Sequence, residues 1–202
     1  LWRGITRNDA HISLEGGFEY SHDLGLYVGN RMAAVEFADS DSNVASPRAF
    51  EQSEFYVGYV RTVGSMRYDI GFIHYDYPGA NASLNYDFME GYISVGYSRG
   101  DVGMKLSVNR SNSFWADSGE ATFVDGSVNY KVDKSWLIQG SLGHQSVENN
   151  TAYGQEDYTV GAVGLSYALD DRLAASASLS KTNLSEGGLN RPGDVKLVVG
   201  LT

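Results

Sequence analysis

Most of this chain alternates between apolar and polar residues with a period of two. The clearest stretch, 102–109, reads VGMKLSVN, and the stretch 93–98 before it reads ISVGYS. Successive side chains of a β-strand point to opposite faces, so each stretch predicts a strand with one apolar and one polar face. A short polar turn, Arg99-Gly100-Asp101, separates them. Together they predict a β-hairpin.

This hairpin recurs along the whole chain. Short turns lie near residues 23, 64, 100, 133 and 170, and longer polar loops separate the hairpins. The pattern predicts an all-β fold: a transmembrane antiparallel up-and-down β-barrel of about 12 strands, with both termini facing the periplasm. We expect 1–6 to be the end of a first strand, and a bulge near Asn30 to interrupt a later one. The other strands are expected over 12–21, 26–37, 51–61, 66–72, 93–98, 102–108, 124–131, 136–145, 162–169, 173–180 and 195–202.

The composition fits one all-β domain whose strands face lipid. The 202 residues include 24 Gly and 14 Tyr but only 3 Pro. No apolar run approaches the ~18 residues that a transmembrane helix needs, which excludes such a helix. The mean hydropathy of −0.28 still allows transmembrane strands, because their second face is polar. We treat 1–202 as a single barrel domain, and we expect it to be truncated at both ends because it opens and closes within strands.

Charge and cysteine content exclude several classes of function. The chain has no Cys, which rules out a disulfide framework and thiol chemistry. Its formal net charge is −10, and nucleic-acid binders need a basic surface, so we expect no nucleic-acid partner. The acidic excess is concentrated in or beside the long loops. This predicts a negative rim that enriches cations, although ordinary solvation of loops explains the same pattern.

Aromatic residues mark one edge of the apolar face. Seven of them lie within a few residues of a short turn and share the parity of the apolar positions. A ring of aromatic side chains at one level is typical of the interfacial girdle of a membrane barrel. In a soluble barrel the apolar face would point inward and tyrosines would be scattered along it, so we favour the membrane barrel. The seven are Tyr20, Tyr59, Tyr68, Tyr97, Tyr130, Trp136 and Tyr167.

In such a barrel the polar face lines the interior. It carries both charge signs beside many Gly and Ser residues. Barrels of about 8 strands are filled by their own side chains and those of about 16 enclose a channel, so about 12 strands allow either a narrow pore or a lumen closed by ion pairs. We favour the pore, because small inward residues leave space. The candidate pore-lining residues are Glu15, Glu19, Arg67, Asp69, Glu90, Lys105 and Asp125.

Patterns for catalysis or metal binding are weak. His144 and Ser146 share the lipid-facing parity near a long loop, an arrangement suited to a lipid hydrolase, but no convincing third residue accompanies them. The acidic run 39–43 resembles the start of a calcium loop but lacks the Gly and the Glu that complete one. We therefore expect no enzyme: no catalytic residues, no metal and no cofactor.

Four stretches resemble the TorF family, a group of porin-type proteins of the proteobacterial outer membrane. They are LWRGITRND (1–9), EGGFEYSHDLGLYVG (15–29), FYVGYVRTVGSMRYDIGFIHYDYPG (55–79) and GYISVGYS (91–98). The resemblance is good in the first half of the chain and rests on pattern alone in the second. It implies a β-barrel in the outer membrane of a Gram-negative bacterium, with a channel role. The terminal aromatic residue usual in such barrels is absent from Gly200-Leu201-Thr202.

The expected function is passive diffusion of small hydrophilic solutes or ions through an outer-membrane porin surrounded by lipid. The alternative is a closed barrel with a structural or partner-binding role, and a lipid hydrolase is less favoured. The sequence leaves open whether the protein forms homo-oligomers. Trimers need a flatter, less aromatic outer face, for which the Ala- and Ser-rich strand 172–180 is a weak candidate.

Overall fold

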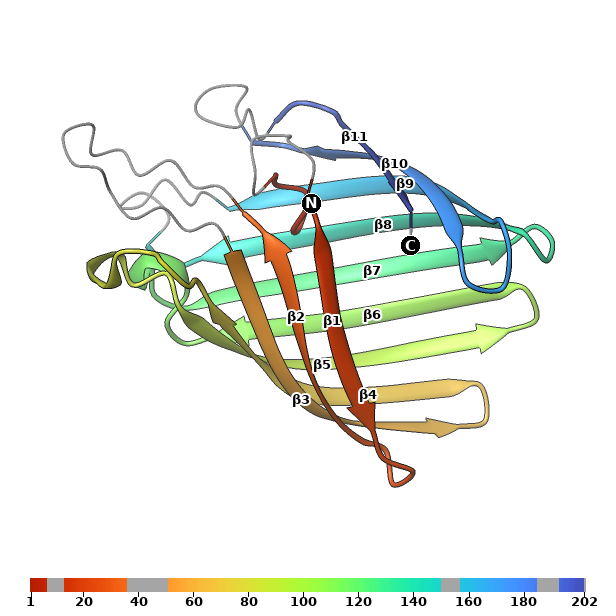
Figure 1. Cartoon of the computed structure of the whole chain (residues 1–202), viewed down its shortest axis with the longest axis horizontal. Helices are drawn as coiled ribbons and strands as arrows, with labels where there is room; N and C mark the ends of the chain where they lie inside the picture. The colour runs from red at the N-terminus through yellow and green to blue at the C-terminus, as the bar shows by residue number, and fades with distance from the viewer. Residues whose placement is uncertain (7–12, 36–50, 150–156, 185–192, 202) are drawn as a thin grey trace.

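The chain forms an antiparallel sheet of eleven strands in the computed structural model of the protein (Figure 1). The structure describes residues 1–6, 13–35, 51–149, 157–184 and 193–201. The strands are β1 (Glu15–Ser21), β2 (Leu26–Ala34), β3 (Glu51–Val63), β4 (Met66–Asp76), β5 (Phe88–Arg99), β6 (Val102–Ser111), β7 (Ala121–Lys131), β8 (Trp136–Val147), β9 (Tyr158–Ala168), β10 (Ala174–Thr182) and β11 (Lys196–Leu201).

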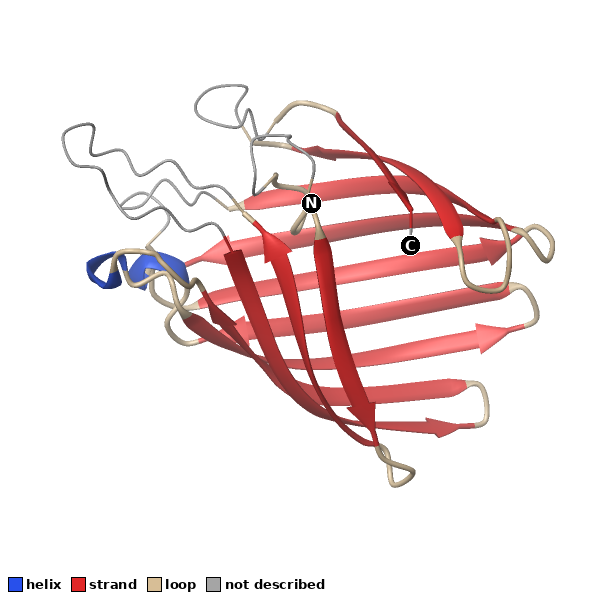
Figure 2. Ribbon diagram, viewed as in Figure 1, coloured by secondary structure: helices blue, strands red, loops and turns tan. Residues whose placement is uncertain are grey.

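Two one-turn 3-10 helices, η1 (Ala82–Leu84) and η2 (Trp115–Asp117), lie in the connections β4–β5 and β6–β7 (Figure 2). Within the described ranges, no helix has the length and apolar character needed to cross a membrane.

Each strand pairs with the next one along the chain, so the order in the sheet is the order in the sequence. The sheet curls until β1–β3 lie across the interior from β5–β7 (Figure 1). Ten antiparallel steps make β1 and β11 run in the same direction, and no pairing between them occurs among the described residues. Closing the ring directly would therefore make a parallel pair, and closing it antiparallel would take one further strand.

Short turns join the strands at one end of the sheet and longer connections join them at the other, as predicted. Two of the short turns are built by an aspartate side chain. Asp133 Oδ1 accepts hydrogen bonds from the backbone N–H of Ser135 (2.7 Å) and of Trp136 (2.9 Å). In the same way, Asp170 Oδ1 accepts hydrogen bonds from the backbone N–H of Arg172 (2.7 Å) and of Leu173 (2.9 Å). Such Asx turns define the hairpin connection through hydrogen bonds between residues close in sequence, and the sequence therefore predicts them.

The outer face of the sheet is an apolar band. Ile70, Leu106 and Leu142 are 53%, 57% and 64% exposed, whereas the inward Glu90 and Gln145 are 1% and 2% exposed. An apolar surface of this extent is unfavourable in water but suits a lipid environment, where the strand backbones are satisfied by one another. The predicted assignment of the two faces is therefore confirmed.

The seven aromatic residues predicted to form a girdle all lie on this outer face. Their exposed fractions range from 36% to 64%. Trp136 and Tyr167 sit side by side on β8 and β9, with ring centroids 4.6 Å apart. Since each of the seven is near a short turn, they occupy the level where the apolar band gives way to the turn end. This arrangement is that of interfacial aromatic residues in membrane barrels.

Two local predictions are wrong. The segment Leu1–Thr6 is not the end of a strand: it turns back on itself through a single bridge in which Trp2 and Ile5 exchange backbone hydrogen bonds of 3.0 and 2.9 Å. No bulge occurs near Asn30, because the pairing of β2 with β1 and β3 runs through this position without a break. The alternation is blurred there because a polar residue stands on the outer face, where the Asn30 amide donates to Ser53 Oγ at 2.8 Å.

Candidate functional site: the interior of the barrel

All seven predicted pore-lining residues have the parity of the inward face, opposite the apolar band, but their surroundings differ. Glu90 is buried, and Asp69 and Asp125 are half-buried. The other four are exposed: Glu15, Glu19, Arg67 and Lys105. The structure therefore separates one buried charge from a group of charges that remain accessible to water.

Three of the exposed charges, Glu19, Arg67 and Lys105, lie toward the short-turn end of the barrel, where the half-buried Asp69 is hydrogen-bonded into the wall. Tyr27 Oη donates to Asp69 Oδ1 at 2.5 Å and is also hydrogen-bonded to the hydroxyl of Tyr92. The guanidinium of Arg67 lies 3.5 Å from Asp69 Oδ2, while 60% of its side chain stays exposed. An ion pair this exposed contributes little to stability, so its charges remain able to interact with a solute.

Two more predicted carboxylates have hydroxyl partners. Tyr56 Oη donates to Glu19 Oε2 at 3.2 Å, and Ser107 Oγ donates to Asp125. Lys105 makes no ion pair with any part of the chain that the structure describes. The interpretation of the interior as closed by ion pairs requires both Arg67 and Lys105 to contact carboxylates, and only Arg67 does so.

The inward glycines do not leave the space that we expected from the sequence. A Cβ atom on Gly58 would lie 2.4 Å from the hydroxyl of Tyr27 and 2.8 Å from that of Tyr92, and one on Gly71 would lie 2.6 Å from Tyr92. The two tyrosines thus lie across glycines of neighbouring strands. In the same way, a Cβ atom on Gly143 would meet the ring of Phe123 at 2.6 Å. These glycines allow rings to lie flat against the wall instead of widening the lumen.

At the opposite end, near the long connections, a side chain that the sequence analysis missed lies in the interior. Arg3 donates to Glu90 Oε2 at 2.6 Å and to Gln145 Oε1 at 2.7 Å. The Arg3 side chain is only 7% exposed and that of Glu90 only 1%. The guanidinium carbon also lies 4.3 Å from the ring centre of Trp2 and 4.4 Å from that of Phe123, which places the cation between two aromatic faces.

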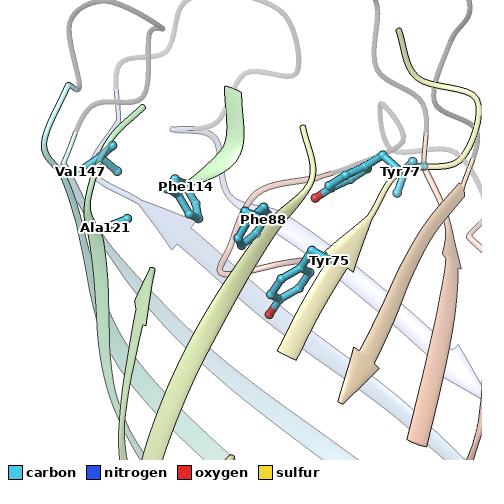
Figure 3. Close-up of a cluster of buried hydrophobic side chains, with 7 residues drawn as sticks. Tyr75, Tyr77, Phe88, Phe114, Ala121 and Val147 are labelled. Carbon is cyan, nitrogen blue, oxygen red and sulfur yellow. The ribbon is translucent and has the colours of Figure 1, made fainter. Parts of the chain in front are cut away.

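An aromatic cluster surrounds this ion pair. Trp2 packs edge-on against Tyr75 and Phe88 and is stacked on Phe114, with ring centroids 6.1 to 6.4 Å apart. Figure 3 shows the buried side chains of this cluster gathered on the inner side of the sheet, below the long connections. The segment Leu1–Thr6 therefore lies at the long-loop end of the barrel, not at the short-turn end where we expected this part of the chain.

A second ion pair lies at this level on β2 and β3. Arg31 Nε donates to Glu54 Oε2 at 2.9 Å, and its terminal nitrogen contacts the same oxygen. The Arg31 side chain is 57% exposed, unlike that of Arg3. Gln52 Nε2 donates to the other carboxylate oxygen of Glu54 at 2.8 Å, which helps to hold the pair against the wall.

The pair His144 and Ser146 does not assemble into a catalytic site. Both lie on the outer face of β8, where His144 Nδ1 is 3.0 Å from Thr159 Oγ1. Ser146 lines a shallow cavity of about 300 Å³ at the rim, together with Arg110 and Glu120, which form a 2.5 Å ion pair. No hydrogen bond joins His144 to Ser146 among the described residues. The run 39–43 lies outside the described residues, within which no group of side chains could hold a metal ion.

Comparison with protein families places the chain in one of them. The sequence profile of a family described as "Bacterial protein of unknown function (Gcw_chp)" matches residues 1–195. The chain belongs to this family. A comparison with curated proteins found no match.

Solved structures with similar folds are outer-membrane barrels. The KdgM porin superposes with a TM-score of 0.67 at 12% identity, covering 94% of this chain and 89% of that one. A porin refined at 1.8 Å gives a TM-score of 0.51 at 14% identity, over 92% of this chain and 59% of the other. A loop-deletion mutant of OmpT, an outer membrane protein of Vibrio cholerae, gives 0.52 at 12% identity, over 93% and 61%. At these low sequence identities, the comparisons show similarity of fold only.

Proposed function

We propose that this protein is an outer-membrane channel through which small hydrophilic solutes or ions diffuse passively. The observation that carries the proposal is the distribution of side chains between the two faces of the sheet. The outer face is an exposed apolar band, and the inner face carries charged side chains that are partly exposed to water. A barrel that only packed a core would have the opposite arrangement. Similarity in fold to porins supports the same function, and so does the resemblance of the sequence to the TorF family.

We assign the lining of this pore to the seven inward residues predicted from the sequence. The described inward positions carry both charge signs in similar numbers, so the wall itself gives little net preference for either. They are Glu15, Glu19, Glu54, Asp69, Glu90 and Asp125 among the acids, and Arg3, Arg31, Arg67, Lys105, Lys131 and Lys196 among the bases.

Carboxylates at the rim give the proposed channel a preference for cations. Glu120 and Glu148 are two such rim carboxylates, and both line the cavity that Ser146 also lines. Exposed charges act over about 10 Å at 0.1 M salt and about 3 Å at 1 M. A preference that originates at the rim is therefore strong in dilute salt and weak in concentrated salt.

Single-channel recording in planar bilayers tests the proposed channel. We expect discrete openings, with a reversal potential under a salt gradient that indicates cation selectivity at about 0.1 M salt and little selectivity near 1 M. The variant Glu120→Gln/Glu148→Gln should lose part of the selectivity and keep its conductance, whereas Lys134→Gln, in the short turn between β7 and β8, serves as a control at the opposite end of the barrel. Folded protein that never opens would contradict the proposal.

The rival function, a closed structural barrel, is favoured by one observation: the segment Leu1–Thr6, whose Arg3 side chain is buried, fills part of the interior. The two functions differ in whether folded protein conducts at all.

We propose no enzymatic activity, since His144 is bound to Thr159 rather than to Ser146. Phospholipid hydrolysis by the wild type that disappears in Ser146→Ala would contradict this assignment.

A further inference from the structure

The segment Leu1–Thr6 contacts strands that are far apart in the sheet. Trp2 packs against β4 and β5 through Tyr75 and Phe88. Arg3 reaches β5, β7 and β8, as described above. A Cβ atom on Gly4 would lie 2.4 Å from Val160 on β9 and 3.1 Å from Thr182 on β10. The contacts therefore extend over seven consecutive strands.

The sheet must curl around the segment for these contacts to form together. Six steps between neighbouring strands, from β4 to β10, cover about 29 Å along the sheet at about 4.8 Å per step. Trp2 and Gly4 are two residues apart, and two residues span about 7 Å at most. The segment therefore crosses the interior of the curled sheet, and it narrows the barrel from inside at the long-loop end.

Side-chain contacts in the interior hold the segment in this position. Ile5 packs against the buried cluster of Phe123, Tyr158 and Val160, while Trp2 packs in the aromatic cluster of Figure 3. Between these two apolar anchors, the Arg3 guanidinium neutralises the buried carboxylate of Glu90. Removing one member of a buried ion pair is strongly unfavourable, because the other is left charged without a partner.

We propose that the segment Leu1–Thr6 forms the constriction of the pore and that the ion pair between Arg3 and Glu90 fixes its position. This proposal rests on the proposed channel function. The remaining passage runs beside the segment, along β1–β3, where Glu15 is exposed and the Arg31 side chain is 57% exposed. Because they fix the position of the segment, Arg3 and Glu90 determine the width of the pore. Arg31 presents an accessible charge at the narrowest level of the pore.

Three variants of the whole chain test this constriction by conductance. Glu90→Gln leaves Arg3 buried without its counter-charge, so the segment should leave the lumen and the unitary conductance should rise by about twofold or more. Arg3→Gln should act in the same direction. The double variant Arg3→Gln/Glu90→Gln removes both charges, and its conductance should return toward the wild-type value. Lys105→Gln, far from the segment, is the control for a simple loss of wall charge.

A labelling experiment measures the position of the segment independently. The chain has no Cys, so Thr6→Cys introduces a unique thiol at a residue that is 6% exposed. With the segment in the lumen, a membrane-impermeant maleimide should react slowly. In the Glu90→Gln background the reaction should be about tenfold faster or more, and in the double variant it should be slow again.

The outcomes separate this proposal from the channel function. Higher conductance and faster labelling in the single variants support the constriction. Channels that open with equal conductance in all variants, with unchanged labelling, would overturn the constriction and leave the channel function standing. Silent bilayers for every variant would overturn the channel function and the constriction with it.

Discussion

Tyrosine and glycine act as partners across neighbouring strands in the wall of this barrel. Tyr27 on β2 and Tyr92 on β5 reach over Gly58 and Gly71, and their hydroxyl groups meet each other and Asp69. The two rings thus connect four adjacent strands by side-chain contacts in addition to the backbone ladder. Because a residue larger than Gly cannot fit beneath them, these positions should be sensitive to the smallest substitution.

Gly58→Ala tests this arrangement. The added methyl group would overlap the Tyr27 hydroxyl, so we expect the free energy of unfolding to fall by about 1 to 3 kcal/mol. Urea unfolding in lipid vesicles, followed by tryptophan fluorescence, measures the change. Gly126→Ala is the matched control, because its nearest neighbouring atom lies 3.9 Å away, and it should be neutral or stabilising by up to about 1 kcal/mol. Equal losses in both variants would show that the tyrosine contact is unimportant.

The sequence predicts single inward residues less well than it predicts strands. Period-two alternation assigns each residue to a face of the sheet, and the structure has Glu90 and Asp69 on the polar face that the alternation predicts for them. It carries no information about which distant side chain meets them. Arg3 pairs with a carboxylate 87 residues away, and such a pairing depends on the curl of the whole sheet rather than on any local pattern.

The strands themselves are the best-predicted elements. Alternation and turn residues locate β5, β6 and the turn between them closely, because an apolar face against lipid and a polar face against water impose one register. The exception is Leu1–Thr6, whose pattern of apolar side chains fits the end of a strand as well as it fits the internal segment observed. There, Trp2 and Ile5 are partly buried against interior clusters instead of facing lipid, and periodicity cannot distinguish these two environments of an apolar side chain.

Strand faces can be tested by placing a charge on each. Leu106→Arg puts a charge on the lipid side of β6, where the side chain is 57% exposed, and should lower the free energy of unfolding by about 2 to 4 kcal/mol. Gln139→Arg places the same group on the inward side of β8, where water is accessible, and should cost less than about 1 kcal/mol.

Urea unfolding in phosphatidylcholine vesicles compares these two variants directly. A cost for Gln139→Arg that equals or exceeds the cost for Leu106→Arg would show that the two faces have been assigned the wrong way round.

For the molecule as a whole, eleven paired strands define the architecture. The sheet has porin-like order and curl, its outer face is apolar, and its interior is divided into two levels. Toward the short turns Glu19, Arg67 and Lys105 are exposed to the interior, and toward the long connections the segment Leu1–Thr6 and aromatic side chains occupy part of the interior and narrow it. The sequence predicted the architecture and the polarity of the two faces, whereas the narrowing could be found only in three dimensions.

Liposome swelling is the most direct test of whether this interior conducts solutes. Vesicles containing the folded protein are placed in isotonic solutions of uncharged sugars of increasing size, and the rate of swelling is recorded by light scattering. We expect rapid swelling with monosaccharides and progressively slower swelling with larger sugars, as in a narrow water-filled passage. Swelling no faster than in protein-free vesicles, with the barrel shown to be folded and inserted, would contradict it.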